Sequence, residues 1–311
     1  MKNKDYTIMK KFAPLIVLLV LVSIKSYGQQ QPQFTQYMYN TIAVNPAYAG
    51  SRNALAINFL SRNQWTGIKD GPETQTLSIH SPLRNDKVGL GLSFLKDQLG
   101  FESFTSAYGD FSYTIKASEK INLSFGIKAG ATYYKIDEEL LADSDPYFNE
   151  RLNRWNMNVG AGALLHTNKW YVGLSVPRII NHDKNNNSQY KSLDRVHYFL
   201  ISGYVFNLGE NLKFKPTMQN KYTKGAPIST DLTATFLFYE KLWLGASYRI
   251  NDEQRDVGFL MDIQVGKQLR VGYAYEIPSG DIKAYTSGSH EILVIYEFKF
   301  SRNKLKSPRY F

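Results

Sequence analysis

The chain has 311 residues, no cysteine and a formal net charge of +10 at neutral pH. Its 22 Tyr and 18 Phe favour β structure, and the lack of cysteine excludes a disulfide scaffold and, for an exported protein, a lipid anchor on cysteine. Residues 1–28 and 301–311 each carry a net charge of +4, so the body between them is weakly charged and a basic nucleic-acid-binding surface is excluded.

The first 28 residues have the pattern of a secretory signal peptide. A positive pair, Lys10–Lys11, precedes the apolar run 12–22, and Ser26 and Gly28 put small residues three and one positions before a cleavage site. The apolar run is too short to span a bilayer, which takes about 20 residues. We therefore expect export by the Sec pathway and cleavage after Gly28.

A stretch without charged residues follows, from position 26 to 51. It is aromatic and rich in Asn and Gln, whereas a free tail is normally charged or rich in Pro and Ser. We expect residues 29–52 to pack against the rest of the protein as a plug or rim; the alternative is a terminal strand or turn that only completes the fold. The turn signal Asn45-Pro46 and the bend at Gly50 make the plug candidates Asn45, Pro46, Ala47, Tyr48 and Gly50.

From residue 53 to 300, apolar and polar residues alternate in a long series of segments. In Ile121–Tyr133 the odd positions are apolar or aromatic and the even positions are Asn, Ser, Gly, Lys, Gly and Thr. A period of two predicts strands with one apolar and one polar face. We expect about 14 strands, an even number as in bacterial single-chain barrels. They should begin near Asn53, Thr74, Lys87, Phe104, Ile121, Trp155, Trp170, Val196, Leu212, Ser229, Leu242, Asp256, Leu269 and His290.

The predicted connections alternate in length. The even-numbered ones are tight, as at 117–120, whereas the odd-numbered ones, such as 96–103 and 135–154, are mostly longer and more polar. Short turns on one rim and longer loops on the other are typical of an up-and-down membrane barrel. We therefore expect an all-β fold, a transmembrane antiparallel β-barrel, with both chain ends on the short-turn, periplasmic side. A soluble all-β protein is the alternative.

The polar face of these strands should line the lumen. It carries many glycines and the charged residues Asp110, Lys128, Asp262, Arg270 and Glu276, which a watery lumen tolerates and a solid protein core does not. Aromatic residues near strand ends predict interfacial girdles. These are Tyr113, Tyr133, Tyr134, Trp155, Trp170, Tyr239, Trp243 and Tyr248.

No pattern in the chain predicts catalysis. The five histidines are dispersed and none falls in a metal-ligand spacing, and there is no GxSxG nucleophile elbow and no phosphate-binding glycine loop. We expect no enzyme activity, no catalytic or metal-binding residue and no cofactor. His80 and His166 are read as satisfied polar residues of the lumen.

Two segments are candidates for contacts with partners. Apolar residues within the acidic loop 137–150 predict either a protein contact or a loop folded over the barrel mouth. The basic tail 301–311 predicts either a docking or assembly signal or attraction to anionic lipid headgroups of the outer membrane. The contact candidates are Leu140, Leu141, Tyr147, Phe148, Arg309, Tyr310 and Phe311.

The two ends of the expected mature chain resemble a known family. QFTQYMYNTIAVNPAYAGSR at 33–52 and SPRYF at 307–311 are similar to the start and end of PorP/SprF proteins, which are outer-membrane proteins of the type IX secretion and gliding machinery. The resemblance implies one of two roles. Some members connect the machinery to a peptidoglycan-binding OmpA-like protein and the periplasmic ring; others support export and surface anchoring of a large adhesin.

A transport barrel is the second hypothesis. Fourteen strands and an N-terminal segment with Asn45-Pro46-Ala47 are also similar to the FadL family of hydrophobic-compound transporters, whose segment plugs the lumen. A lumen lined by Lys, Asp and Glu favours the first reading over a greasy tunnel. A general porin is the third hypothesis. It ranks below the other two because no inward-folding charged constriction loop is evident.

Overall fold

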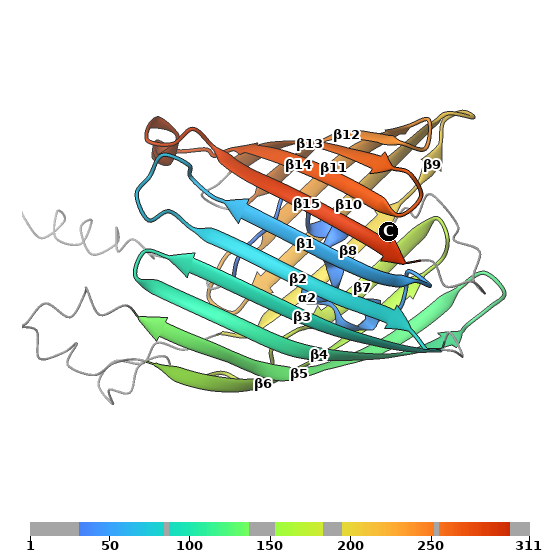
Figure 1. Cartoon of the computed structure of the whole chain (residues 1–311), viewed down its shortest axis with the longest axis horizontal. Helices are drawn as coiled ribbons and strands as arrows, with labels where there is room; N and C mark the ends of the chain where they lie inside the picture. Colours follow the sequence, from blue (N-terminus) through green and yellow to red (C-terminus); the bar gives the residue numbers. More distant parts are fainter. Residues whose placement is uncertain (1–30, 84–86, 137–152, 183–194, 252–254, 299–311) are drawn as a thin grey trace, which may run out of the picture. The chain divides into compact units, whose positions relative to one another are not determined.

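The computed structural model describes residues 31–83, 87–136, 153–182, 195–251 and 255–298, and these residues form a closed antiparallel β-barrel (Figure 1). Fourteen strands build it, because the short β9 continues β8 after a break at Val205 and both pair with β10. The strands are β1 Leu55–Asn63, β2 Glu73–Pro82, β3 Val88–Leu99, β4 Glu102–Lys116, β5 Asn122–Ile136, β6 Arg154–His166, β7 Trp170–Val176, β8 His197–Tyr204, β9 Phe206–Asn207, β10 Leu212–Thr223, β11 Ser229–Phe238, β12 Leu242–Ile250, β13 Arg255–Val265, β14 Leu269–Ile277 and β15 Ser289–Phe298.

Each strand pairs with its neighbours in the sequence, and the first strand pairs with the last. The β1–β15 seam runs in register from Leu55 opposite Phe298 to Asn63 opposite His290. Closure leaves no free sheet edge, which is a requirement for strands that cross a lipid bilayer. The predicted fourteen-stranded up-and-down barrel is confirmed, and the strands begin within two residues of the expected positions.

The apolar faces of the strands point outward and the polar faces point inward. In β13, Phe259 is 53% exposed whereas Asp262 is fully buried, and the same alternation runs through the other strands. An apolar exterior is the arrangement expected for a barrel wall in contact with lipid. No helix in the described part of the chain is long and apolar enough to cross a membrane.

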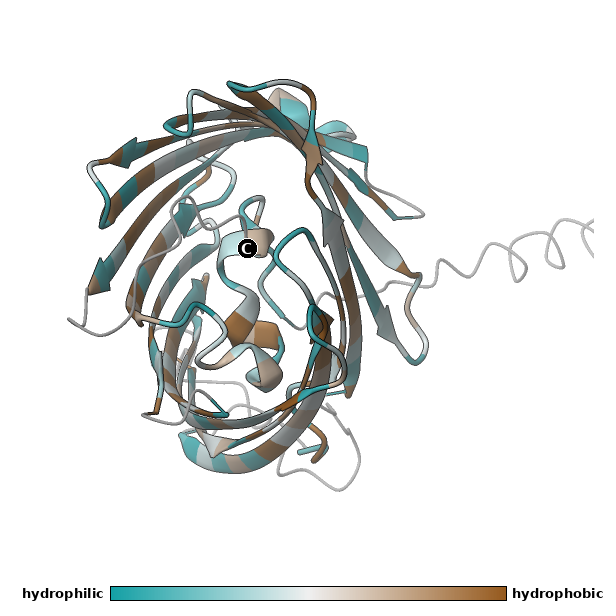
Figure 2. Cartoon of the chain, turned by 90° about the vertical axis from the view of Figure 1, so that its right-hand side faces the viewer, coloured by the Kyte–Doolittle hydropathy of each residue, from teal (hydrophilic) through white to brown (hydrophobic). Residues whose placement is uncertain are grey.

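The interior holds the chain's own N-terminal segment. Residues 31–53, called here the lumen segment, lie inside the ring of strands as short helical turns, which Figure 2 shows along the barrel. They form η1 Tyr37–Tyr39, α2 Thr41–Val44 and η2 Pro46–Tyr48. A further turn, η4 Asp281–Ala284, lies in the β14–β15 connection. The expectation of an N-terminal segment packed at or in the lumen is thus confirmed.

Three sequence expectations are wrong in detail. The connection expected at 96–103 is a short turn between Leu99 and Glu102, because β3 and β4 stay paired up to Leu99 opposite Glu102; Asp97, within β3, accepts a hydrogen bond from Thr74 Oγ1 at 2.5 Å. Tyr134 and Trp243 are buried in the interior instead of joining an outer girdle. Trp155 and Tyr239, in contrast, are strongly exposed on the outside.

Candidate functional site in the barrel lumen

The lumen segment begins with an apolar cluster. Its residues Phe34, Tyr37, Met38 and Tyr39 are buried against inner-face residues of four strands, namely Leu60, Leu260, Ala274, Leu293 and Ile295. The Tyr37 hydroxyl shares a hydrogen bond with Thr217 Oγ1 at 3.0 Å. The inner wall therefore carries a greasy patch opposite the aromatic start of the segment.

Five charged side chains meet beside this patch and form what we call the arginine–carboxylate cluster. They come from five strands: Arg62 from β1, Asp231 from β11, Arg249 from β12, Glu276 from β14 and Glu291 from β15. All five are buried. Charged groups are rarely buried unless they are paired, so we expect the loss of one member of this cluster to leave a buried charge without its partner and to destabilise the barrel.

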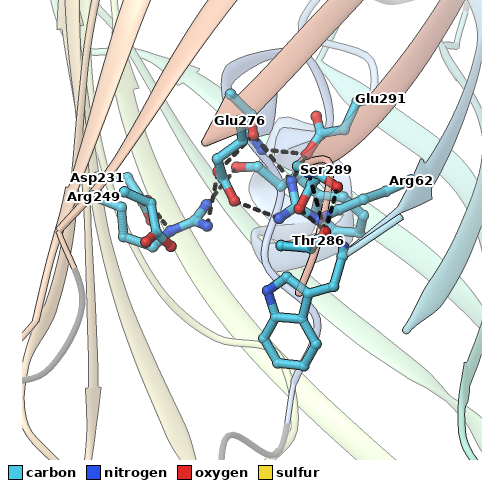
Figure 3. A network of polar contacts seen from close by, with 12 residues as sticks. Arg62, Asp231, Arg249, Glu276, Thr286, Ser289 and Glu291 are labelled. Carbon is cyan, nitrogen blue, oxygen red and sulfur yellow. Dashed lines mark hydrogen bonds and ion pairs between the residues drawn. The ribbon is translucent and has the colours of Figure 1, made fainter. Parts of the chain in front are cut away.

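Each arginine in the cluster contacts two carboxylates. Arg62 lies 2.5 Å from Glu291 and 2.6 Å from Glu276, while Arg249 lies 2.6 Å from Asp231 and 3.0 Å from Glu276. Figure 3 shows the two guanidinium groups on opposite sides of the Glu276 carboxylate. Glu276 thus joins the two arginines into one network.

The cluster also binds the backbone of the lumen segment. The Glu291 carboxylate accepts hydrogen bonds from the backbone N–H of Thr35 at 2.5 Å and of Gln36 at 3.0 Å. The Thr35 hydroxyl donates to Glu276 at 2.8 Å. Hydrogen bonds to charged groups are roughly twice as strong as neutral ones. The carboxylates therefore hold both the arginines and the peptide.

Lys128 of β5 provides a second charged support under α2. Its ammonium group donates to the carbonyl oxygens of Ile42 and Ala43, both at 3.1 Å, and lies 3.3 Å from Asp110. Carbonyl groups at the last turn of a helix lack partners within the helix and attract a cation. Lys128 thus ties the segment to the wall while Asp110 compensates its charge.

Tyr39 lies between buried cations on the other side of the lumen. The Lys215 ammonium is 4.6 Å from the Tyr39 ring and 4.5 Å from the Trp243 ring, and the Arg270 guanidinium is 5.1 Å from Tyr39. The π faces of the rings attract the cations, and this attraction is stronger at a site from which water is excluded.

The predicted Asn45-Pro46-Ala47 turn lies against β6. Asn45 Oδ1 accepts a hydrogen bond from the Ala47 backbone N–H at 3.0 Å and so caps η2, with Pro46 at its first turn. Asn45 Nδ2 donates to the Ala163 carbonyl oxygen at 3.1 Å. One buried amide therefore both begins the turn and fastens it to the barrel wall.

Tyr48 and Gly50 lie at the end of the lumen where a turn connects β2 to β3. The Gly50 backbone N–H donates to His80 Nδ1 at 3.1 Å, and the Tyr48 ring meets the His80 ring edge-on at 5.4 Å. Arg52 donates to the Tyr48 hydroxyl and pairs with Glu297 at 3.1 Å. His80 is thus a buried residue with defined partners. The structure brings the five plug candidates together along one path; their role in closing the lumen stays a proposal.

Several inner-face glycines make room for the lumen segment. A Cβ at Gly126 would overlap the Ala47 backbone, and one at Gly162 would overlap the Asn45 side chain. These glycines were interpreted from the sequence as a sign of a watery lumen. Their role in the structure is close approach of a second backbone, for which only glycine is small enough.

We expect Gly126→Val to loosen the lumen segment and to destabilise the protein by about 1–3 kcal/mol, the usual range for an overfilled core. The outward-facing Gly109→Val is the matched control, since its nearest contact for a Cβ is an Ala129 carbonyl oxygen at 3.9 Å. Guanidinium unfolding of protein folded in detergent measures both. Equal stability of the two variants would contradict close packing at Gly126.

The remaining candidates from the sequence lie outside the described residues. These are Leu140, Leu141, Tyr147, Phe148, Arg309, Tyr310 and Phe311, together with residues 1–30. Sequence reasoning also missed the clustering of Arg62, Asp231, Arg249 and Glu291. The available signal was the position of these charges on inner faces, close to the longer connections. Within the described residues, no group of three or more His, Cys, Asp or Glu is placed to hold a metal ion.

Comparison with known proteins agrees with this barrel. Residues 26–296 match the family model described as type IX secretion system membrane protein PorP/SprF. The chain belongs to the PorP/SprF family. No match was found among curated proteins. Like the family, this PorP/SprF protein is an outer-membrane barrel associated with the type IX secretion machinery.

Solved outer-membrane barrels resemble this PorP/SprF protein in fold. The CymD monoaromatic hydrocarbon channel superposes with a TM-score of 0.52 at 10% identity, covering 84% of this chain and 93% of that one. The Omp33 outer membrane protein of Acinetobacter baumannii gives 0.48 at 12% identity, covering 79% and 98%. The KdgM porin gives 0.38 at 10% identity, covering 79% and 100%. At these identities the likeness to CymD shows the barrel fold alone.

Proposed function

We propose that this protein is a structural component of the type IX secretion machinery whose barrel is closed by its lumen segment. It supports export or surface anchoring of a partner adhesin, or it links the machinery to periplasmic components such as an OmpA-like peptidoglycan-binding protein. The contacts are made by its outer loops and its C-terminal tail. Solute passage through the lumen is not part of this function, and neither is catalysis.

The position of the lumen segment inside the ring of strands is the observation that supports the proposal. A conduit needs a continuous polar or apolar path, whereas here the segment is fixed to the wall along its length by Glu291, Lys128 and His80. These partners come from β15, β5 and β2 on one side of the barrel, and Thr217 of β10, which bonds to Tyr37, adds a contact from the opposite wall. Such a barrel serves as an anchored platform in the membrane.

The alternative is a transporter of hydrophobic compounds. The lining does not favour it, because the inner wall places buried arginines, lysines and carboxylates against the segment where a greasy tunnel would be expected. The similarity to CymD, described as a monoaromatic hydrocarbon channel, concerns the fold. Selective passage of a hydrophobic solute across liposomes would establish the alternative.

Export and partner contacts complete the proposal. The signal-peptide pattern of residues 1–28 supports Sec export with cleavage after Gly28. The apolar residues Leu140 and Leu141 would contact a surface partner, and the terminal Tyr310 and Phe311 a periplasmic one. A chain with one acidic loop and one basic tail is suited to separate contacts on the two sides of the membrane.

Deleting the gene is expected to block export of type IX substrates, or of one adhesin, and to impair gliding where the cell glides. Complementation with Leu140→Asp/Leu141→Asp tests the outer contact, and removal of residues 301–311 tests the periplasmic one. Each variant is first checked for normal amounts of heat-modifiable barrel in the outer membrane. A deletion strain that exports every type IX substrate and glides normally would refute the proposal.

A further inference from the structure

The two ends of the barrel differ, and this gives the lumen segment a direction. β1 and β14 lead into the longer connections 64–72 and 278–288, which lie together at the left in Figure 1. The connections 167–169, 239–241 and 266–268 are short and lie at the opposite end. In bacterial outer-membrane barrels the short turns are periplasmic and the long loops extracellular. We call the long-connection end the outer mouth.

The first residues of the lumen segment lie at the outer mouth. Gln33 Nε2 donates to Ser229 Oγ at 3.2 Å, and Ser229 is the first residue of β11 after connection 224–228. Glu291, which binds Thr35 and Gln36, is the third residue of β15 after connection 278–288. The contacts of the segment's start are thus with the outer ends of strands.

Gln31 reaches the connections themselves. With its amide oxygen turned toward Arg178, it accepts hydrogen bonds from Nε at 3.1 Å and Nη2 at 2.8 Å. Arg178 is the second residue after Val176, which ends β7, and so lies in connection 177–196. Gln31 and Pro32 are partly exposed, whereas the residues that follow them are buried.

The far end of the segment lies at the short turns. Gly50 contacts His80 near the end of β2, and Ser112, in the last third of β4, donates to the Ala49 carbonyl oxygen at 2.7 Å. Arg52 pairs with Glu297, next to the last residue of β15. The segment therefore passes through the whole lumen, from the outer mouth at Gln31 to the periplasmic start of β1, whereas the sequence predicted both chain ends on the periplasmic side.

We propose that the arginine–carboxylate cluster is a binding site for the chain's own N-terminal peptide, and that it holds Gln31 and Pro32 at the outer mouth, on the cell surface. With cleavage after Gly28, Gln31 is the third residue of the mature chain. The ligand is main chain: two backbone N–H groups on Glu291, and the Phe34 carbonyl oxygen, which accepts from Arg249 Nη2 at 3.4 Å. The residues exposed at the cell surface would then belong to the same segment that lies inside the lumen.

Cysteine labelling of intact cells tests the location, because the natural chain has no cysteine. Gln31→Cys and Pro32→Cys are compared with Lys69→Cys at the outer mouth and Lys120→Cys at the short β4–β5 turn. A membrane-impermeant maleimide is expected to label the first three in intact cells. Lys120→Cys is expected to react only after the outer membrane is permeabilised.

The outcomes separate clearly. Labelling of position 31 or 32 under the same condition as position 69, and not 120, supports the proposal. The proposal is overturned if positions 31 and 32 both react only after the outer membrane is permeabilised, as position 120 is expected to do. It is also overturned if position 120 reacts in intact cells and position 69 does not. Each variant is labelled after denaturation to show that its thiol is reactive. Export of type IX substrates is scored separately, so failure here is distinguishable from failure of the proposed function.

The binding site is tested by its effect on a buried position. Gln33, which is 8% exposed, is replaced by Cys, and its labelling rate is measured in purified folded protein with and without Glu291→Ala. We expect a severalfold faster rate with Glu291→Ala, because Thr35 and Gln36 lose their acceptor. Glu240→Ala, at the short-turn end, is the control. An unchanged rate with Glu291→Ala in a folded barrel would refute the site.

Discussion

Arg62→Met is expected to destabilise the folded barrel by about 3–5 kcal/mol, the usual result of breaking a buried ion pair from one side. Arg62 is 1% exposed and lies against two carboxylates, of which Glu291 is also 1% exposed. Methionine fills similar space but supplies no charge, so Glu291 keeps only its bonds to the segment's backbone. Guanidinium unfolding of the protein in detergent, followed by tryptophan fluorescence, measures the change.

Two controls separate this effect from general disturbance. Lys213→Met removes an ion pair with Glu240, whose side chain is 37% exposed, and such pairs contribute about 0–1 kcal/mol. Arg62 and Glu291 face each other directly across the β1–β15 seam, so Arg62→Met/Glu291→Met should recover part of the loss. A loss with Arg62→Met no larger than with Lys213→Met would contradict the role of the cluster.

The barrel itself could be predicted from the sequence because its wall repeats one local rule. Each strand alternates between lipid and lumen, so the pattern at Ile121–Tyr133 or in β13 identifies a strand without knowledge of its neighbours. Loop lengths then fix which end is which. A wall of fourteen such strands is expected to close, because a free sheet edge in lipid would leave backbone N–H and C=O groups without hydrogen bonds.

The contents of the lumen could not be predicted in the same way. Arg62 and Glu291 are 229 positions apart in the sequence and become neighbours only through the closing seam. Leu260 is an apolar residue on the otherwise polar inner face of β13, and it was the signal in the sequence for an apolar patch on the inner wall. Trp243 lies near a strand end like a girdle residue, yet its side chain has the inward parity of β12.

The inner charges illustrate why one observation supported two interpretations. Asp110 and Lys128 were correctly assigned to the inside, but as the lining of a watery space. In the structure both are buried, and Lys128 donates to two carbonyl oxygens of the lumen segment. A charged inner face excludes an apolar core, but it does not exclude a peptide that supplies its own polar backbone.

Deletion of residues 31–50 is expected to convert an electrically silent barrel into one that carries a steady ion current. The deletion removes η1, α2 and η2, together with the plug candidates Asn45, Tyr48 and Gly50 at the short-turn end. The wall that the deletion uncovers carries charged side chains of both signs that are buried in the full chain, including Lys128 and Glu291. These side chains would hydrate and line a water-filled path, as in porins. Planar bilayers with the purified protein give the measurement.

The same deletion uncovers the greasy inner patch, so the open barrel should also be less stable than the full chain. Circular dichroism and heat-dependent gel mobility establish that the variant is folded before it enters the bilayer. Removal of residues 301–311 is the control and should stay silent. If the deletion variant does not fold, Glu276→Ala/Glu291→Ala, which frees only the outer part of the segment, should give brief openings. A folded deletion variant as silent as the full chain, or a full chain as conductive as the variant, would show that the lumen segment does not close the barrel.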